Sequence, residues 1–224
     1  VDGSVARTNQ SSWANARDAT SGTFSGGSTT RNTQAIIADK TSARGGGTAY
    51  NVSRAFFEFD TSGISVAPTS ATLKIFGYIG ISADFFVVKS THTAITTANF
   101  DAIDGWSAGA DNSSNVTKYS SEITTWSTSA FNDITLNSTA LSDIGASGTR
   151  FKVCLIQADH DLPNNDALGA TLSTGLWRTF NTIHLDYTEG TAGYGHDVVG
   201  VASANIGKVN GVATANIGKI NTVD

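Results

Sequence analysis

Apolar and polar residues alternate along most of this chain from about Ala55 onward, and this alternation constrains its fold more than any other feature. A repeat of two residues is typical of β-strands that bury one face and expose the other. In RAFFEFD the pattern predicts the inward set Ala55, Phe57 and Phe59, with Arg54, Phe56 and Glu58 on the opposite, wetted face. The same alternation predicts further strands in SATLKIFGY, FFVVKSTH, DITLNS, RFKVCLIQA, GLWRTF and TIHLDYTE.

Turn residues separate these strands. Gly63 and Pro68 lie between the first two runs, and such residues end strands because they supply a positive φ or fix φ. Short strands with turn signals at intervals of roughly 8 to 20 residues are typical of sandwiches and not of parallel α/β sheets. We therefore predict an all-β fold, an antiparallel β-sandwich of the jelly-roll type, over residues 1–189.

Helical pattern is scarce. TTANFDAI and STALSDIG each predict only a turn or two of helix. Ahead of the alternating region the chain is rich in Ser, Thr, Gly and Asn. There we expect two strands, SSWANARDA and TQAIIADK, with GTFSGGSTTRN and SARGGGTAY as loops.

The C-terminal part is built differently, because GVASANIGKVN is followed at once by GVATANIGKIN. We expect a linker at residues 190–199 and a repeat tail at residues 200–224 whose apolar side chains form one stripe. Glycines and the dipeptide Asn210-Gly211 favour short helical turns broken at each Asn-Gly, and a disordered polar tail is the alternative.

A tail this short cannot bury its stripe of apolar side chains by folding on itself. We therefore expect it to dock on the body, on sister subunits or on another protein. The docking residues would be Val201, Ile206, Val209, Val212, Ile217, Ile220 and Val223.

Bulk composition argues against several classes of function. The net charge is -5, and the sequence has no cluster of Lys and Arg of the kind that a nucleic-acid-binding protein uses. It has no run of about 18 apolar residues that could span a membrane, and its polar start lacks the hydrophobic region of a signal peptide. A chain that starts at Val1 and has no Met is expected to be made and assembled inside a cell, although a processed precursor would look the same. The single cysteine, Cys154, is expected to be a buried small hydrophobe.

The sequence contains no assembled catalytic constellation. The four histidines have no zinc-binding spacing, and no GxSxG nucleophile elbow occurs. A carboxylate pair for glycoside hydrolysis stays an alternative, since spatial pairing is invisible in a sequence. We expect a protein that is not an enzyme and needs no cofactor.

The densest group of titratable residues lies in IQADHDLPNND, at the end of a predicted strand. Asp159, Asp161 and Asp166 offer oxygen ligands that suit Ca²⁺, but their spacing matches no EF-hand. The preferred interpretation is a solvated, Asp-rich turn, and a structural Ca²⁺ site formed by these three residues is the alternative.

Two of the four tryptophans, Trp106 and Trp126, are candidates for stacking on a sugar, because a flat aromatic face receives a pyranose ring well. The competing interpretation, which we prefer, is that they belong to the core or cover a sheet edge.

Longer phrases of the chain resemble known families. The run RAFFEFDTSGISVAPTSATLKIFGY, followed by NVTKYSSEITTWSTSAFNDITLNSTALSDI and FKVCLIQADHDL, resembles a family of tailed-bacteriophage structural proteins, especially those of marine phages. The phrase R-x-F-x-x-F-D-T-S-x-I is also similar to jelly-roll, carbohydrate-binding-like domains of bacterial surface proteins. The repeat ANIGKVNGVATANIGKIN is similar to repeats that end many phage virion proteins.

The resemblance implies a non-enzymatic structural protein located in the virion, displayed as capsid decoration, spike, fibre or tail component. It implies capsid or tail proteins as partners and a homo-oligomeric state, with no nucleic acid or membrane as partner. The alternative is a carbohydrate-binding adhesin module that attaches to a glycan on the host surface.

Overall fold

The computed structural model describes residues 2–27, 33–42, 46–79, 84–146, 150–166, 172–178, 183–190, 208–209 and 212–213. Its strands are β1 (Asp2–Gln10), β2 (Phe24–Gly27), β3 (Thr33–Ser42), β4 (Thr48–Asp60), β5 (Ser70–Ile79), β6 (Phe85–Lys89), β7 (Phe131–Thr135), β8 (Arg150–Gln157), β9 (Leu172–Arg178), β10 (Ile183–Thr188), β11 (Lys208–Val209) and β12 (Val212–Ala213). Its helices are α1 (Trp13–Arg17), η1 (Thr97–Asn99) and α2 (Ser138–Ala146).

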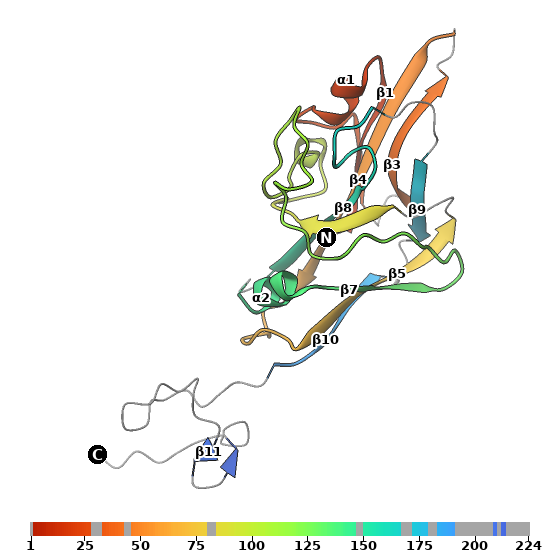
Figure 1. The fold of residues 1–224 in the computed structure, drawn as a ribbon. Helices are drawn as coiled ribbons and strands as arrows, with labels where there is room; N and C mark the ends of the chain where they lie inside the picture. Colours follow the sequence, from red (N-terminus) through yellow and green to blue (C-terminus); the bar gives the residue numbers. More distant parts are fainter. Residues whose placement is uncertain are drawn as a thin grey trace.

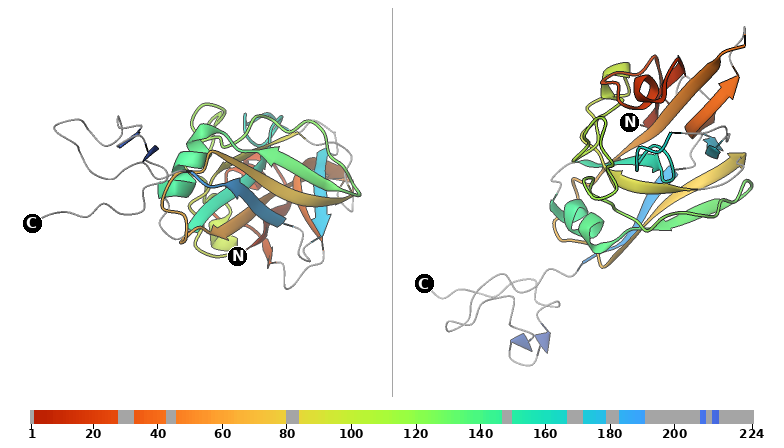
Figure 2. Two further views of the ribbon diagram at one scale, coloured as in Figure 1. Left: turned by 90° about the horizontal axis from the view of Figure 1, so that it is seen from below. Right: turned by 45° about the horizontal axis from the view of Figure 1, so that its top comes forward.

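The described strands β1 to β10 join in one network of antiparallel pairs. The path runs β10-β5-β9-β3-β4-β1-β2, while β7 pairs with β5, and β8 pairs with both β4 and β6. The network folds over on itself, so that the layer β7-β5-β10 packs against the layer β4-β8-β6 (Figures 1 and 2). The expected all-β, antiparallel β-sandwich is therefore confirmed.

The first core lies between these two layers. It contains the residues that the alternation placed inward on β4, β5, β7 and β8, and α2 closes one end with Ala140 and Ile144. Its fully or nearly fully buried members are Ile36, Ala55, Phe57, Ala71, Leu73, Ile75, Phe85, Val87, Tyr119, Ile134, Leu136, Ala140, Ile144, Phe151, Val153 and Leu155.

A second core covers the opposite face of the β4-β8-β6 layer. Arg54 and Phe56 were expected on a wetted face, but both are 0 % exposed. The helix α1 and the long connection from β6 to β7 supply the cover, with Trp13, Phe100 and Ile103 among the packing residues. The layer is thus buried on both faces. An alternating pattern indicates which side chains share a face of a strand. It does not indicate whether a helix or an irregular segment covers that face.

Several expected elements in the N-terminal part were wrong. SSWANARDA was expected to be a strand, but it contains α1, whose first turn is capped by the Ser12 side chain accepting a bond of 3.2 Å from the amide of Asn15. The strand β1 was not predicted. Of the two segments expected to be loops, GTFSGGSTTRN contains β2, and SARGGGTAY contains the start of β4. TQAIIADK is confirmed as part of β3, and STALSDIG as α2.

In the tail, the structure describes only the hairpin β11–β12. Val209 pairs with Val212, and Lys208 pairs with Ala213. These four residues form strands and not the helical turns that the sequence favoured. The other expected docking residues and most of the expected linker lie outside the described residues.

None of the described helices has the length and apolar character needed to cross a membrane.

Candidate functional site

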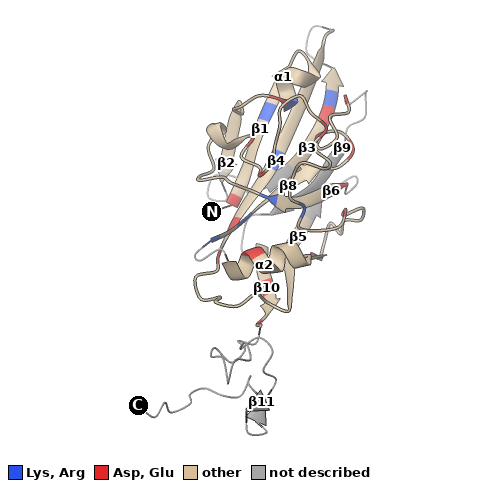
Figure 3. Cartoon of the chain, turned by 60° about the vertical axis from the view of Figure 1, so that its left-hand side comes forward, with Lys and Arg blue, Asp and Glu red and all other residues tan. Residues whose placement is uncertain are grey.

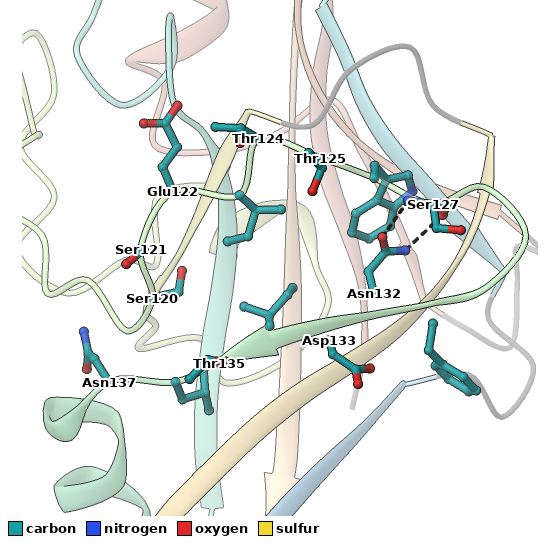
Figure 4. A pocket seen from close by; sticks show the side chains of 15 residues that line it. Ser120, Ser121, Glu122, Thr124, Thr125, Ser127, Asn132, Asp133, Thr135 and Asn137 are labelled. Atoms are coloured by element: carbon teal, nitrogen blue, oxygen red, sulfur yellow. Dashed lines mark hydrogen bonds between the residues drawn. The ribbon is translucent and has the colours of Figure 1, made fainter.

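A groove of about 730 Å³ lies between β7 and the extended segment 120–127 (Figure 4). The segment follows the outer edge of β6, where Ile123 and Phe85 exchange backbone hydrogen bonds of 2.9 and 3.3 Å. The groove therefore opens beside the first core, between β7 and the segment that pairs with β6.

Most side chains along the groove are neutral and polar. Hydroxyl groups come from Ser120, Ser121, Thr124, Thr125, Ser127 and Thr135, and amides from Asn132 and Asn137 (Figure 4). Apolar surface comes from Ile123, Trp126, Phe131, Ile134 and Leu136. Apolar walls with a few polar groups are typical of sites for small molecules, and hydroxyls and amides both donate and accept hydrogen bonds.

Trp126 is the aromatic residue that links the groove to the core. It lines the groove, while its ring packs edge-on against Phe85 at 5.6 Å between centroids. Its indole nitrogen is buried and has no hydrogen-bond partner among the described residues. Trp126 is thus half-buried, with one part lining the groove and another packing on the core. Its stacking on a sugar stays a prediction.

The side chain of Asn132 fixes the loop that follows Trp126. Its Oδ1 accepts a bond of 2.7 Å from the Ser127 amide, and its Nδ2 donates to the Ser127 carbonyl at 3.0 Å and to the Ile75 carbonyl at 3.3 Å. Gly77 on β5 permits this approach, since a Cβ there would collide with the Ser127 carbonyl. The groove wall is therefore held in place by the neighbouring strand.

The same pair of hydrogen bonds between an asparagine side chain and a serine backbone occurs a second time in the chain. Asn112 accepts a bond of 2.9 Å from the Ser107 amide and donates to the Ser107 carbonyl at 3.0 Å. Both loops carry the pattern W-S-x-x-A-x-N, in WSAGADN and in WSTSAFN. This internal repeat was missed in the sequence, and it is the signal that could have identified both loops.

Trp106, the other candidate for sugar stacking, belongs to the second core. The guanidinium carbons of Arg54 and Arg17 lie 4.0 and 4.5 Å from the centre of its ring. Its ring thus serves as a packing surface for two buried cations. The groove contains Trp126 but not Trp106.

The predicted Asp-rich turn contains a buried ion pair. Asp161 is 0 % exposed, and its two carboxylate oxygens accept bonds of 2.7 and 2.8 Å from the guanidinium of Arg54. Arg17 approaches the same carboxylate at 3.7 Å and donates to the Asp161 carbonyl at 2.6 Å. Burial lowers the pKa of Arg17, although the nearby carboxylates of Asp161 and Asp18 oppose this shift.

The other two candidate calcium ligands have separate surroundings. Asp159 and Asp166 are exposed, the first contacting Gln157 and the second the Tyr50 hydroxyl at 3.3 Å. Within the described residues, no three His, Cys, Asp or Glu side chains form a group that could hold a metal ion. A calcium site of Asp159, Asp161 and Asp166 is therefore not assembled in this part of the chain, and Asp161 is not in a solvated turn either.

Acidic and basic residues are interspersed over the described body (Figure 3).

Neither the family models nor the curated proteins compared with this chain give a match.

Proposed function

We propose that this chain is a non-enzymatic structural protein of a tailed-bacteriophage particle, displayed as capsid decoration, spike, fibre or tail component. The observation that carries the proposal is the tandem 11-residue repeat placed after a sandwich body with its own core. The resemblance of both parts to phage virion proteins points the same way.

The hairpin β11–β12 supports a docking role for the tail. It has only two residues in each strand, and an isolated two-stranded hairpin of this size is at best marginally stable in water. The paired residues Val209 and Val212 would gain most by burial against a partner, either a sister subunit or another virion protein.

Deletion of residues 197–224 tests this role. We expect the body to keep its circular dichroism spectrum while incorporation into particles falls at least about tenfold, because the docking contacts are lost. The double variant V209S/V212S should give a smaller loss, and K208Q, a change at the hairpin's charged position, should give none. Unchanged incorporation of the deletion variant would refute a docking tail.

A second function, carbohydrate-binding attachment to a host surface, is favoured by the groove. Its hydroxyl and amide groups, together with the half-buried Trp126, suit a ligand that has apolar ring faces and many hydroxyls. A displayed virion protein could use such a groove to attach the particle to a cell.

Binding without cleavage is favoured by the carboxylates of the groove. Glu122 and Asp133 come from opposite walls, and in Figure 4 their carboxylates point away from each other. A glycosidase holds two carboxyl groups about 5 to 10 Å apart on either side of one bond.

A matched pair of tryptophan substitutions tests glycan binding. Thr124 and Thr128 are both exposed, but only Thr124 lines the groove. We expect T124W to fill the groove and abolish binding on a glycan array, whereas T128W should bind like the unchanged protein. An array on which the unchanged protein binds nothing would refute this second function.

A further inference from the structure

We infer that the groove selects neutral glycans and rejects acidic ones such as uronates and sulfated sugars. This inference rests on the proposed glycan-binding function and specifies its substrate class. The hydroxyl and aromatic groups of the groove suit a sugar but do not determine whether that sugar is neutral or charged. The charged residues along the groove determine this.

The charged residues that line the groove are both acidic. They are Glu122 and Asp133, and the lining of described residues contains no Lys, Arg or His. A carboxylate or sulfate that enters such a groove loses hydration without gaining a cation from the lining. The carboxylates of Glu122 and Asp133 lie on the two sides of the groove and point away from each other, so they repel such an anion through their field and not by direct contact (Figure 4). Like charges brought together across an interface suppress binding of the wrong partner.

The cation that pairs with Asp133 does not reverse this charge. The ammonium of Lys74 lies 3.7 Å from a carboxylate oxygen of Asp133 and 3.5 Å from one of Asp186. One ammonium thus faces two carboxylates there, and Glu122 on the other wall adds a third negative charge.

The neutral groups of the groove are available to a ligand. Ser121, Thr124, Thr125 and Thr135 are exposed, and each hydroxyl can donate one hydrogen bond and accept others. Sugar hydroxyls have the same dual capacity, so a neutral oligosaccharide can satisfy these groups without an ionic contact.

The body does gather cations at a different cavity. Lys89, Arg150 and Lys152 line a separate cavity of about 380 Å³. Each of the three has a carboxylate within 4 Å, Asp143 for Lys89 and Glu58 for the other two. The absence of cations from the groove lining is therefore a local property of the groove.

The test compares sugars that differ in charge but keep one backbone. Neutral hexasaccharides of glucose, mannose and galactose are titrated into the full chain by calorimetry at low salt. For each one that binds, the C6-oxidised hexauronate and its uncharged methyl ester follow. We expect the hexauronate to bind at least about tenfold more weakly than the neutral sugar, and the methyl ester to recover most of the loss. Added salt should narrow the gap, because it screens the repulsion.

Two sets of variants assign the result to the groove. The double variant E122Q/D133N should improve hexauronate binding at least about threefold, whereas D159N, at an exposed aspartate outside the groove, should not change it. A hexauronate that binds as tightly as the neutral sugar, with binding still lost in T124W, would overturn the inference and leave glycan binding intact. No binding by any hexasaccharide would overturn the proposed glycan binding itself.

Discussion

Asp161 is the residue on which the charge balance of the second core depends, because its carboxylate faces two buried guanidinium groups. Arg54 binds it through two nitrogen atoms, and Arg17 lies close by. Both arginine side chains are fully buried, so no solvent replaces the carboxylate if it is lost. A buried cation without its partner is far more costly than a broken surface pair.

The substitution D161N should lower the free energy of unfolding by about 3 to 5 kcal/mol, because it leaves the buried Arg54 without its counterion and leaves Arg17 with Asp18 alone. Urea denaturation followed by tryptophan fluorescence measures the change. D159N, an isosteric change at an exposed neighbour, should stay within about 0.5 kcal/mol of the unchanged protein. Equal effects of the two substitutions would show that Asp161 has no special structural role.

His92 should make the fold sensitive to acid. Burial, with a further contribution from Lys152, lowers its pKa from 6.5 to about 4. Between these values the unfolded chain binds a proton that the folded chain does not, so stability falls as the pH drops from about 6.5 to 4. The loss attributable to His92 approaches about 3 kcal/mol at the acid end.

Urea midpoints measured across this pH range test the role of His92. H92N cannot titrate, so its stability should fall less steeply with acid than that of the unchanged protein. Parallel curves for the two proteins would assign the acid sensitivity to other groups.

The two W-S-x-x-A-x-N loops show how a single side chain can order an irregular element. In each loop, an asparagine pairs with both the amide and the carbonyl of the serine five residues before it. Asn112 is fully buried, whereas Asn132 is only partly buried. The first loop supports the second core, and the second loop forms the end of the groove.

N112A and N132A should therefore differ in their effects. Each substitution leaves a serine amide and carbonyl without their partner, which costs about 1 to 3 kcal/mol. N112A should lie at the upper end because water does not reach its site, and N132A at the lower end. Amide hydrogen exchange at Ser107 and Ser127 would report the local loosening, and a larger effect for N132A would contradict the burial argument.

Sequence patterns predicted the long, regular elements and missed the short or compositionally biased ones. STALSDIG forms the predicted helix, but the segment with a predicted strand contains α1, although Trp13, Ala16 and Arg17 are spaced for one helical face. The strand β1 was hidden in DGSVARTNQ, where small and polar residues weaken the alternation. Tertiary pairing with β4 and β2 stabilises β1, and local composition does not report it.

The described body has three layers, with β4, β8 and β6 buried between two cores. The sequence predicted the first core well, because Phe151, Val153 and Leu155 alternate as expected. It did not predict the second core, whose cover comes from a helix and irregular chain. Apart from Trp126, the groove was not predicted either. Its walls are far in the sequence from the strands β5 and β6 that support them.

Substitution of two adjacent phenylalanines tests the three-layer arrangement. Phe56 and Phe57 point to opposite cores and are 0 % and 1 % exposed. F56A and F57A should each cost about 3 to 5 kcal/mol, because each opens a cavity in a packed core. F131A, at a residue that is 42 % exposed, should cost much less. A small effect of F56A alone would mean that the second face of β4 is wetted after all.

The most direct test of a displayed virion protein with a docking tail is quantitative mass spectrometry of purified phage particles. We predict that the full chain is present at a fixed copy number per particle, and that the chain lacking residues 197–224 is depleted at least about tenfold. Particles that contain no copies of the full chain, or equal copies of both chains, would contradict the account.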